Sequence, residues 1–550
     1  MTHPLTRRTL FIRGGRLVVG AAVLSALRPS PGFAQPSVDT EDLVDAGDGF
    51  RRGRGDGAEV GAGPRGAVVR PTRDGATFVS TPLRGSMPFT HIGLHWATIT
   101  PGGADPTFEL RSGPDGVTWS DWQPVQVERS PEDTRVDDAF GGLIYVGDAR
   151  YVQYRARFRA ARGGTTSLQR VTATAIHSKP VGGTSPPPTV TTVTDQDAGR
   201  SLGVVRREDW GVDEAARFSG GREVWAEMFV PAKKLVVHHT ATRNSYADPA
   251  AAAAEVRAIF QYHAVQQAWG DIGYAAIIDK FGFIHEGRHG RGGDPGDASA
   301  TREILSSGVV AAHDFAHNYG TAGVALLGNA TAKDWPMRAA SGPMWDALVR
   351  YGVFEAGRHF LRPVTTGGAP AASDFLRSDG TWTIGMRTVS GHNETSATAC
   401  PGTPVMNLLP SLRTAIHTGL VGVSRTGVQF TSTPGGTQVA RGTRLSYAWQ
   451  AEPPEAGWAV AGYEHCWEGW SKPAGSDDIH YLVGYQTDGS GQIVSQPRAR
   501  WTVVDLNTKT ASFAPSQPGH YTLHVRAVLS GPGGVTRRGA YEANHTVLVT

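Results

Sequence analysis

The chain has 550 residues, of which 39% are hydrophobic and 19% are charged, a composition typical of folded proteins rather than disordered ones. Its 70 glycines and 35 prolines favour turn-rich β modules, and its two cysteines exclude a disulfide-rich scaffold. The net charge of +3 depends on five arginines within residues 1–34. Without that segment the charge is −2, so the remaining chain has no basic field to attract nucleic acid.

Residues 1–34 are predicted to be an export signal. Basic residues precede an apolar stretch, residues 17–27, which is too short to span a membrane. The adjacent Arg7 and Arg8 indicate a twin-arginine signal, and an ordinary secretory signal is the alternative. We therefore expect a secreted or cell-wall-associated protein with no integral membrane span.

The next part of the chain is predicted to hold a disordered segment, a β module and a linker. Residues 35–67 are rich in Gly, Asp and Arg and offer few apolar side chains to bury, which predicts disorder. Residues 68–178 contain strand-like alternation, as at 151–158, without a helical period, so a β-sandwich-like module is expected. The Thr- and Pro-rich residues 179–200 are predicted to form an extended linker.

Residues 201–421 are predicted to form a mixed α/β domain. A helix is expected at residues 249–268, because Asp248 is a good N-cap and Pro249 suits the first helical position. A hairpin is expected to follow at residues 275–286.

The last region, residues 422–550, alternates polar and apolar side chains around residues 521–527, which indicates an Ig-like β-sandwich. Its Cys466 is expected to be a buried free thiol. The predicted fold is therefore multidomain, with a central α/β domain between two all-β sandwich-like modules.

Three residues far apart in the central region indicate a metal site. His238 follows an apolar strand, His392 lies in the segment GHNETSATACPG, and Cys400 is expected at a helix start, where the helix dipole lowers the pKa of a thiol. Zinc prefers nitrogen and sulfur ligands, and a catalytic zinc site uses three of them and keeps one position for water. Because the chain has 19 histidines, other ligand combinations stay open at this point.

Five ordered motifs, at residues 207–211 and then further along the chain, carry a family resemblance. They are REDWG, VVHHTAT, WGDIGYAAIIDKFGFIHEGR, TAGVALLGN and GHNETSATACPGT. Together they resemble the peptidoglycan recognition protein and type 2 N-acetylmuramoyl-L-alanine amidase family over about residues 205–415. The resemblance implies a mixed sheet flanked by helices, with a zinc-containing groove that binds the glycan strand and stem peptide of peptidoglycan. Its zinc ligands correspond to His238, His392 and Cys400.

The resemblance also implies an activity, hydrolysis of the amide between N-acetylmuramic acid and L-alanine of the stem peptide. The implied catalytic residues are Tyr274 and Thr398, although some relatives carry Lys in place of this Thr. His313, Asn318 and Arg288 resemble residues that bind substrate. Family members that only recognise the cell wall usually lack the cysteine ligand, so its presence here favours an enzyme.

Two other functions compete with the amidase hypothesis. The first is a non-catalytic peptidoglycan-binding protein with the same fold. The second uses Cys400 as a nucleophile with a histidine base, as in cysteine peptidases. The flanking β modules are expected to hold the enzyme near the wall or to space it from the surface.

Overall fold

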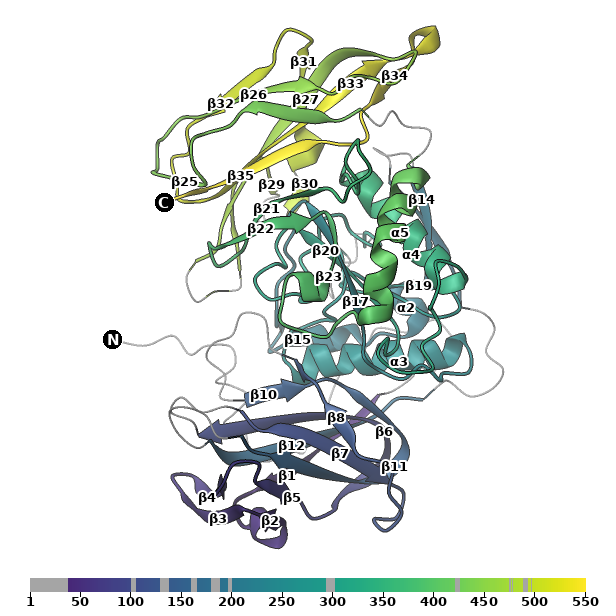
Figure 1. Cartoon of the computed structure of the whole chain (residues 1–550), viewed down its shortest axis with the longest axis vertical. Helices are drawn as coiled ribbons and strands as arrows, with labels where there is room; N and C mark the ends of the chain where they lie inside the picture. Colours follow the sequence, from purple (N-terminus) through teal and green to yellow (C-terminus); the bar gives the residue numbers. More distant parts are fainter. Residues whose placement is uncertain are drawn as a thin grey trace.

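The computed structural model describes residues 38–99, 105–128, 138–159, 166–179, 188–195, 200–292, 302–420, 426–473, 476, 478–487, 493–495 and 497–550. Figure 1 shows three tiers: a β tier at the bottom, a mixed tier with the helices in the middle, and a second β tier at the top. The expected signal sequence at residues 1–34 lies outside the described residues. None of the described helices is long and apolar enough to cross a membrane.

Twelve strands of the described residues form the first tier as one hydrogen-bonded sheet, with the central order β2-β5-β11-β6-β12-β4-β3. Long β6 pairs with β10, β11 and β12, so the sheet closes around a core that contains Trp96, Phe108 and Tyr154. The strands are β1 Asp39–Ala46, β2 Arg54–Asp56, β3 Ala58–Gly63, β4 Gly66–Pro71, β5 Thr77–Val79, β6 Leu83–Ile99, β7 Thr107–Gly113, β8 Gln123–Val125, β9 Val127–Glu128, β10 Asp138–Gly141, β11 Ile144–Arg157 and β12 Ser167–His177.

The predicted disorder of residues 35–67 is wrong for the part that the structure describes. β1 pairs along its whole length with β12, from Asp39 opposite His177 to Ala46 opposite Arg170. A 3-10 helix, η1 (Gly47–Arg52), follows and buries Phe50 completely. The segment folds despite its few apolar residues, because β12 completes the backbone hydrogen bonds of β1 while Leu43 and Phe50 join the core of the tier.

The middle tier is built on a five-stranded mixed sheet with the order β19-β18-β20-β17-β23. Its neighbours pair in parallel except for the β18–β19 hairpin. The elements of this tier are β13 Thr191–Asp195, β14 Arg200–Val204, α2 Arg207–Trp210, η2 Glu214–Arg217, β15 Phe218–Ser219, β16 Arg222–Glu223, β17 Lys234–His239, α3 Pro249–Gln261, η3 Tyr262–Gln266, β18 Ala276–Ile278, β19 Ile284–Glu286, β20 Thr321–Leu326, α4 Pro343–Arg358, β21 Ala372–Leu376, β22 Trp382–Arg387, β23 Val389–Gly391, η4 His392–Glu394 and α5 Thr403–Gly419.

Helices cover both faces of the mixed sheet because its strands alternate two apolar faces. Leu235 and Val237 of β17 pack with α4 and α5, whereas Ile277 of β18 packs with α3. The predicted N-terminus of α3 is confirmed, since Asp248 Oδ1 accepts a hydrogen bond of 2.8 Å from the N–H of Ala251. The predicted helix continues beyond α3 as the π-helical turn η3. The predicted hairpin is also confirmed as β18 and β19.

Part of the predicted linker at residues 179–200 is a strand. β13 pairs with β14 over five positions, from Thr191 opposite Val204 to Asp195 opposite Arg200. Val193 packs against the core beneath α4 and α5, which gives this Thr-rich stretch an apolar surface to bind. β-branched residues that have such a surface favour a strand over a free linker.

The top tier contains a three-stranded sheet and a seven-stranded sheet, which share one core of aromatic and aliphatic residues. Cys466 of this tier is buried and free, as expected. The elements are β24 Val428–Ser432, β25 Gln438–Val439, β26 Leu445–Ala451, β27 Ala459–Ser471, β28 His480–Val483, β29 Gln486–Thr487, β30 Ile493–Ser495, η5 Pro497–Arg500, β31 Thr502–Asp505, β32 Thr510–Phe513, β33 Gly519–Ser530, η6 Pro532–Gly534, β34 Thr536–Arg538 and β35 Ala543–Val549.

Candidate metal centre

Two neighbouring parallel strands bring the candidate histidine ligands together. β17 and β23 are in register with Val237 opposite Gly391, and the next residue along each strand is a histidine. His238 and His392 therefore emerge at the same edge of the sheet, and their ring centroids are 4.4 Å apart. This edge is where the carboxyl ends of parallel strands meet, the usual place for a site in an α/β fold.

Cys400 reaches the same edge from the loop between η4 and α5. Its Sγ lies 3.7 Å from His238 Nδ1 and accepts a hydrogen bond of 3.3 Å from the N–H of His239. The ligand atoms of His238, His392 and Cys400 all lie within 4.8 Å of one another. His238 is buried, whereas His392 and Cys400 are partly exposed, so the cluster is open on one side.

The donor set fits zinc. Two imidazole nitrogens and one sulfur, with one side open, match the three-ligand arrangement of catalytic zinc sites. Burial, reinforced by nearby His392 and His313, holds the pKa of His238 well below its usual value, so its imidazole is neutral and able to bind a cation. These residues therefore offer zinc the nitrogen and sulfur ligands that it prefers.

The expected lowering of the Cys400 pKa by a helix dipole is wrong for the metal-free site. α5 begins at Thr403, so Cys400 precedes the helix rather than capping it. Burial raises the pKa of the thiol and outweighs the hydrogen bond from the N–H of His239. Cation binding must therefore displace the thiol proton, which makes metal affinity depend on pH.

A chain of hydrogen bonds fixes the tautomer of His238. The Thr321 hydroxyl donates to the carbonyl of His317 at 2.6 Å, which leaves its oxygen to accept from Nε2–H of His313 at 3.0 Å. His313 Nδ1 is then an acceptor, and it lies 3.0 Å from His238 Nε2. His238 therefore carries its proton on Nε2 and turns a bare Nδ1 towards Cys400.

Asp314, which is not among the site residues predicted from the sequence, orients the second histidine. Its Oδ1 lies 3.5 Å from His392 Nε2 and accepts a hydrogen bond of 2.7 Å from the Ser396 hydroxyl. Burial would raise the pKa of Asp314, but bonds to His317 and His392 hold it well below its usual value. Carboxylates behind ligating histidines set ring orientation in metal sites. The available signal was its position beside His313 in the segment AHDFAHN.

The two predicted catalytic residues lie on different sides of the cluster. The Tyr274 ring centroid is 5.6 Å from that of His238, and burial raises the tyrosine pKa well above its usual value, so its hydroxyl stays protonated. Thr398 is exposed, and its Oγ1 accepts a hydrogen bond of 3.2 Å from the N–H of Cys400. Tyr274 therefore lies beside His238, and Thr398 lies beside Cys400.

The structure places the three predicted substrate-binding residues beneath the surface instead of along a groove. His313 and Asn318 are 6% and 0% exposed, and Asn318 Oδ1 accepts hydrogen bonds from the backbone N–H groups of His313 and Asp314. Arg288 is 3% exposed and lies over the Trp225 ring at 4.4 Å. Asn318 thus holds the backbone of His313 and Asp314 beside the cluster.

Comparisons with known proteins give relatives for part of the chain. No protein-family model matches it. The N-acetylmuramoyl-L-alanine amidase of Homo sapiens is 30% identical over 201 residues, which cover 36% of this chain and 26% of that relative. The enzyme of the same name from Sus scrofa is 29% identical over 201 residues, covering 36% and 25%. The chain thus spans about a quarter of the length of these curated relatives.

Solved structures of peptidoglycan recognition proteins also align with it. Drosophila PGRP-LB matches at 20% identity and a TM-score of 0.25, covering 38% of this chain and 91% of that one. Drosophila PGRP-SD matches at 22% identity and a TM-score of 0.25, covering 38% and 92%. The curated relatives confirm the resemblance drawn from the motifs, since part of this chain is similar in sequence to proteins named N-acetylmuramoyl-L-alanine amidase.

Proposed function

We propose that the chain is a zinc-dependent peptidoglycan hydrolase that cleaves the amide between N-acetylmuramic acid and L-alanine of the stem peptide. The observation that carries this proposal is the convergence of His238, His392 and Cys400 within 4.8 Å at one sheet edge. The curated relatives named N-acetylmuramoyl-L-alanine amidase supply the substrate class.

In this proposal His238, His392 and Cys400 would hold a zinc ion, which would supply a water molecule of lowered pKa and a Lewis acid for the scissile carbonyl. The Tyr274 hydroxyl donates a hydrogen bond to the oxygen that becomes negative during attack. The Thr398 hydroxyl donates a weaker hydrogen bond to the same oxygen, because it carries no charge. The His313–Thr321 chain and Asp314 keep both imidazoles in the orientation that binding requires.

The test compares metal content and amide cleavage in the wild type and Cys400→Ser, with Cys466→Ser as the matched cysteine control. We expect one zinc per chain in the wild type and the control, and loss of zinc and activity in Cys400→Ser. Activity is measured as muramic lactyl groups and stem peptides released from purified sacculi. Full metal content in Cys400→Ser would contradict the ligand assignment.

The same experiment separates the two competing functions. Tight binding of sacculi with one zinc and no released peptide would identify a non-catalytic binding protein. Activity that survives chelation but is lost on thiol alkylation would identify Cys400 as a nucleophile. The cysteine ligand favours the hydrolase because it completes a three-ligand site with an open position.

We also propose export through the twin-arginine route, followed by residence outside the cell or at its wall. The support is the pair Arg7 and Arg8 before the short apolar stretch at residues 17–27. Replacing both arginines with lysine is expected to leave the precursor inside the cell. Unchanged export of that variant would favour the ordinary secretory signal.

A further inference from the structure

The β21–β22 hairpin forms its own two-stranded sheet beside the central mixed sheet. Phe375 of β21 and Met386 of β22 pack in one buried cluster with Val236 of β17. Because side chains alternate along a strand, Val236 belongs to the sheet face opposite to Leu235 and Val237. Figure 1 shows the hairpin between the central sheet and the top tier. The hairpin therefore covers part of the sheet face that α4 and α5 leave open.

Lys234 anchors this hairpin to the strand that carries the first candidate ligand. Lys234 begins β17, and His238 lies near the end of the same strand. The lysine is 2% exposed, and its Nζ donates to the carbonyl and the hydroxyl of Ser373 at 3.1 and 2.7 Å and to the carbonyl of Met386 at 2.7 Å. Ser373 and Met386 are opposite each other in the hairpin. One buried side chain thus holds both hairpin strands against β17.

The hairpin holds His317, which lies in the loop before β20. Thr383 Oγ1 of β22 is 2.7 Å from His317 Nε2, and the Phe375 ring stacks on the imidazole with centroids 5.8 Å apart. His317 Nδ1 is 2.9 Å from the carbonyl oxygen of Phe315, which can only accept, so Nδ1 carries a proton. In the neutral imidazole, Nε2 then accepts from the Thr383 hydroxyl. These contacts fix Nδ1 as the donor of His317.

The same donor faces the carboxylate behind the second candidate ligand. His317 Nδ1 lies 3.4 Å from Asp314 Oδ1, the oxygen that accepts from Ser396 and lies 3.5 Å from His392 Nε2. Among the described residues, no group hydrogen-bonds to Asp314 Oδ2, although that oxygen is buried. Within this part of the chain the carboxylate is therefore held through one oxygen, and loss of one contact leaves it freer to turn away from His392.

The hairpin also reaches the second candidate ligand through the backbone. Arg387 ends β22 and pairs with Glu394 of η4, the short helix that begins with His392. Glu394 Oε2 accepts a hydrogen bond of 2.9 Å from the N–H of Gly391, the residue before His392. The hairpin thus contacts both the turn that carries His392 and, through His317, the carboxylate behind it.

We propose that Thr383 and His317 are positioning residues of the candidate metal centre, through which the β21–β22 hairpin holds the Asp314 carboxylate behind His392. With Asp314 facing Nε2 of His392, Nδ1 of that ring is the nitrogen left to bind a cation. A carboxylate in this place also makes the imidazole a better ligand. The inference rests on the proposed function only in taking the same three residues as ligands.

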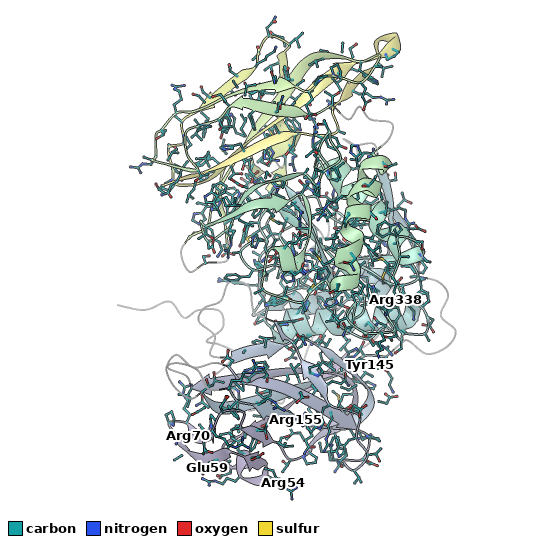
Figure 2. The ribbon with its side chains drawn as sticks, in the orientation of Figure 1. Arg54, Glu59, Arg70, Tyr145, Arg155 and Arg338 are labelled. Atoms are coloured by element: carbon teal, nitrogen blue, oxygen red, sulfur yellow. The ribbon has the colours of Figure 1, made fainter. Side chains whose placement is uncertain are left out.

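The test measures the affinity of the full-length protein for Zn²⁺ and Co²⁺ by competition with a chromophoric chelator, and the visible spectrum of bound Co²⁺, which reports ligand geometry. Thr383→Val removes the hydroxyl and keeps the shape of the side chain. The matched control is Thr381→Val, which removes an exposed hydroxyl bonded at 2.6 Å to Asp379 in the turn of the same hairpin. A second control is Arg338→Gln, because Figure 2 labels exposed Arg338 on the side of the middle tier away from the hairpin.

We expect Thr383→Val to weaken zinc binding roughly 2- to 10-fold, the effect of losing one hydrogen bond, and to shift the Co²⁺ bands. His317→Leu should weaken binding roughly tenfold or more, and His317→Asn should recover most of this loss because its amide N–H takes the place of Nδ1. A role in packing alone would lower the melting temperature of the metal-free protein without changing affinity or spectrum. If Thr383→Val matches the wild type and Thr381→Val in zinc affinity and Co²⁺ spectrum, the inference is overturned.

A double-mutant comparison shows whether His317 acts through Asp314. We expect His317→Leu to weaken zinc binding in the wild-type background and to have little further effect in Asp314→Asn, because residues of one hydrogen-bond network are not additive. Equal losses in the two backgrounds would contradict the proposed connection. If His317→Leu does not fold, Thr383→Val replaces it in both backgrounds.

Failure of the inference and failure of the proposed function give different results. If the wild type binds zinc but releases no stem peptide, the amidase proposal fails, and the affinity comparison still decides the role of the hairpin. If the wild type cleaves sacculi and both Thr383→Val and His317→Leu match its zinc affinity, only the inference fails.

Discussion

Replacing His313 with alanine tests the hydrogen-bond chain behind the candidate metal centre. His313 Nδ1 accepts from Nε2–H of buried His238 at 3.0 Å. Without that acceptor the Nε2 proton is unsatisfied, at a cost of about 1–3 kcal/mol for a buried polar group. The tautomer with the proton on Nδ1 also becomes accessible, and it cannot bind a cation through the nitrogen that faces Cys400.

Since 1.4 kcal/mol corresponds to a tenfold change in an equilibrium constant, zinc affinity should fall roughly 5- to 140-fold. This range agrees with the 10- to 100-fold losses typical when the outer partner of a ligating histidine is removed. The assay is chelator competition at fixed pH, with thermal unfolding of the metal-free protein as a check on folding.

His313→Gln is the informative companion variant, because its side-chain carbonyl offers an acceptor in place of Nδ1. We expect it to recover most of the affinity that His313→Ala loses. If His313→Ala folds normally and binds zinc within twofold of the wild type, the tautomer of His238 is set by some other contact and the reasoning is refuted.

Four further predictions concern catalysis, stability and packing. Thr398→Lys should raise kcat on sacculi several-fold, because a charged donor stabilises a developing oxyanion better than a hydroxyl; an unchanged kcat would place Thr398 outside the reaction. Arg207 is fully buried and pairs with Glu214 and Asp271, so Arg207→Leu should lower the free energy of unfolding in denaturant by about 3–5 kcal/mol. The control Arg206→Leu should lower it by at most about 1 kcal/mol, because Arg206 is partly exposed. Burial would raise the pKa of Asp271, but Arg207 and neighbouring arginines lower it to about 2 from 3.8. The ionised Asp271 therefore stabilises the fold above pH 4, and this contribution is lost as pH falls towards 2. In Asp271→Asn, the denaturant midpoint of unfolding should therefore decrease less between pH 4 and pH 2 than in the wild type. Gly93→Ala should lower the melting temperature, because its new methyl group would lie 2.0 Å from the Tyr262 ring where the bottom and middle tiers meet. An unchanged melting temperature would show that the Tyr262 ring can move to accommodate the methyl group.

The sequence was most informative where structure is local. The strand before His238, the N-cap of α3 and the β18–β19 hairpin each depend on neighbouring residues, and each is found as predicted. The ligand set came from the family resemblance, because only His238 was expected at the end of a strand, and the short strand β23 before His392 was not predicted. What periodicity alone could not supply was the β17–β23 pairing, which joins segments about 150 residues apart.

The errors arose where a residue's environment comes from a distant part of the chain. Asp39 to Ala46 look too polar to fold, yet β12 completes their hydrogen bonds. Cys400 looks like a helix cap with an easily lost proton, yet it lies in the loop ahead of α5, where desolvation raises the pKa of its partly exposed thiol. His313 looks like a groove residue, yet β20 and His238 enclose it. In each case the local sequence identified the residue of interest but did not show which distant segments would surround it.

Deletion of residues 422–550 tests whether the top tier is an independent module, because the structure shows buried contacts between it and the middle tier. Arg498 of the top tier donates to the carbonyl of Ala232 at 3.3 Å and to His359 at 2.9 Å, both in the middle tier. Lys233 of the middle tier pairs with buried Glu468 of the top tier at 3.2 Å.

A spacer joined only by its chain would leave the melting temperature of the truncated protein equal to that of the full-length one. Here truncation leaves Lys233 and the Ala232 carbonyl without their partners and exposes the surface that Tyr541 covers in the central core. We therefore expect the truncated protein to melt several degrees lower, about 2–4 °C for each kcal/mol lost in a domain of this size. Loss of wall retention on truncation is then interpretable only after zinc content and melting temperature are matched, because partial unfolding of the middle tier would reduce binding as well. Equal melting of the two forms would instead show that the middle tier folds without stabilisation from the top tier.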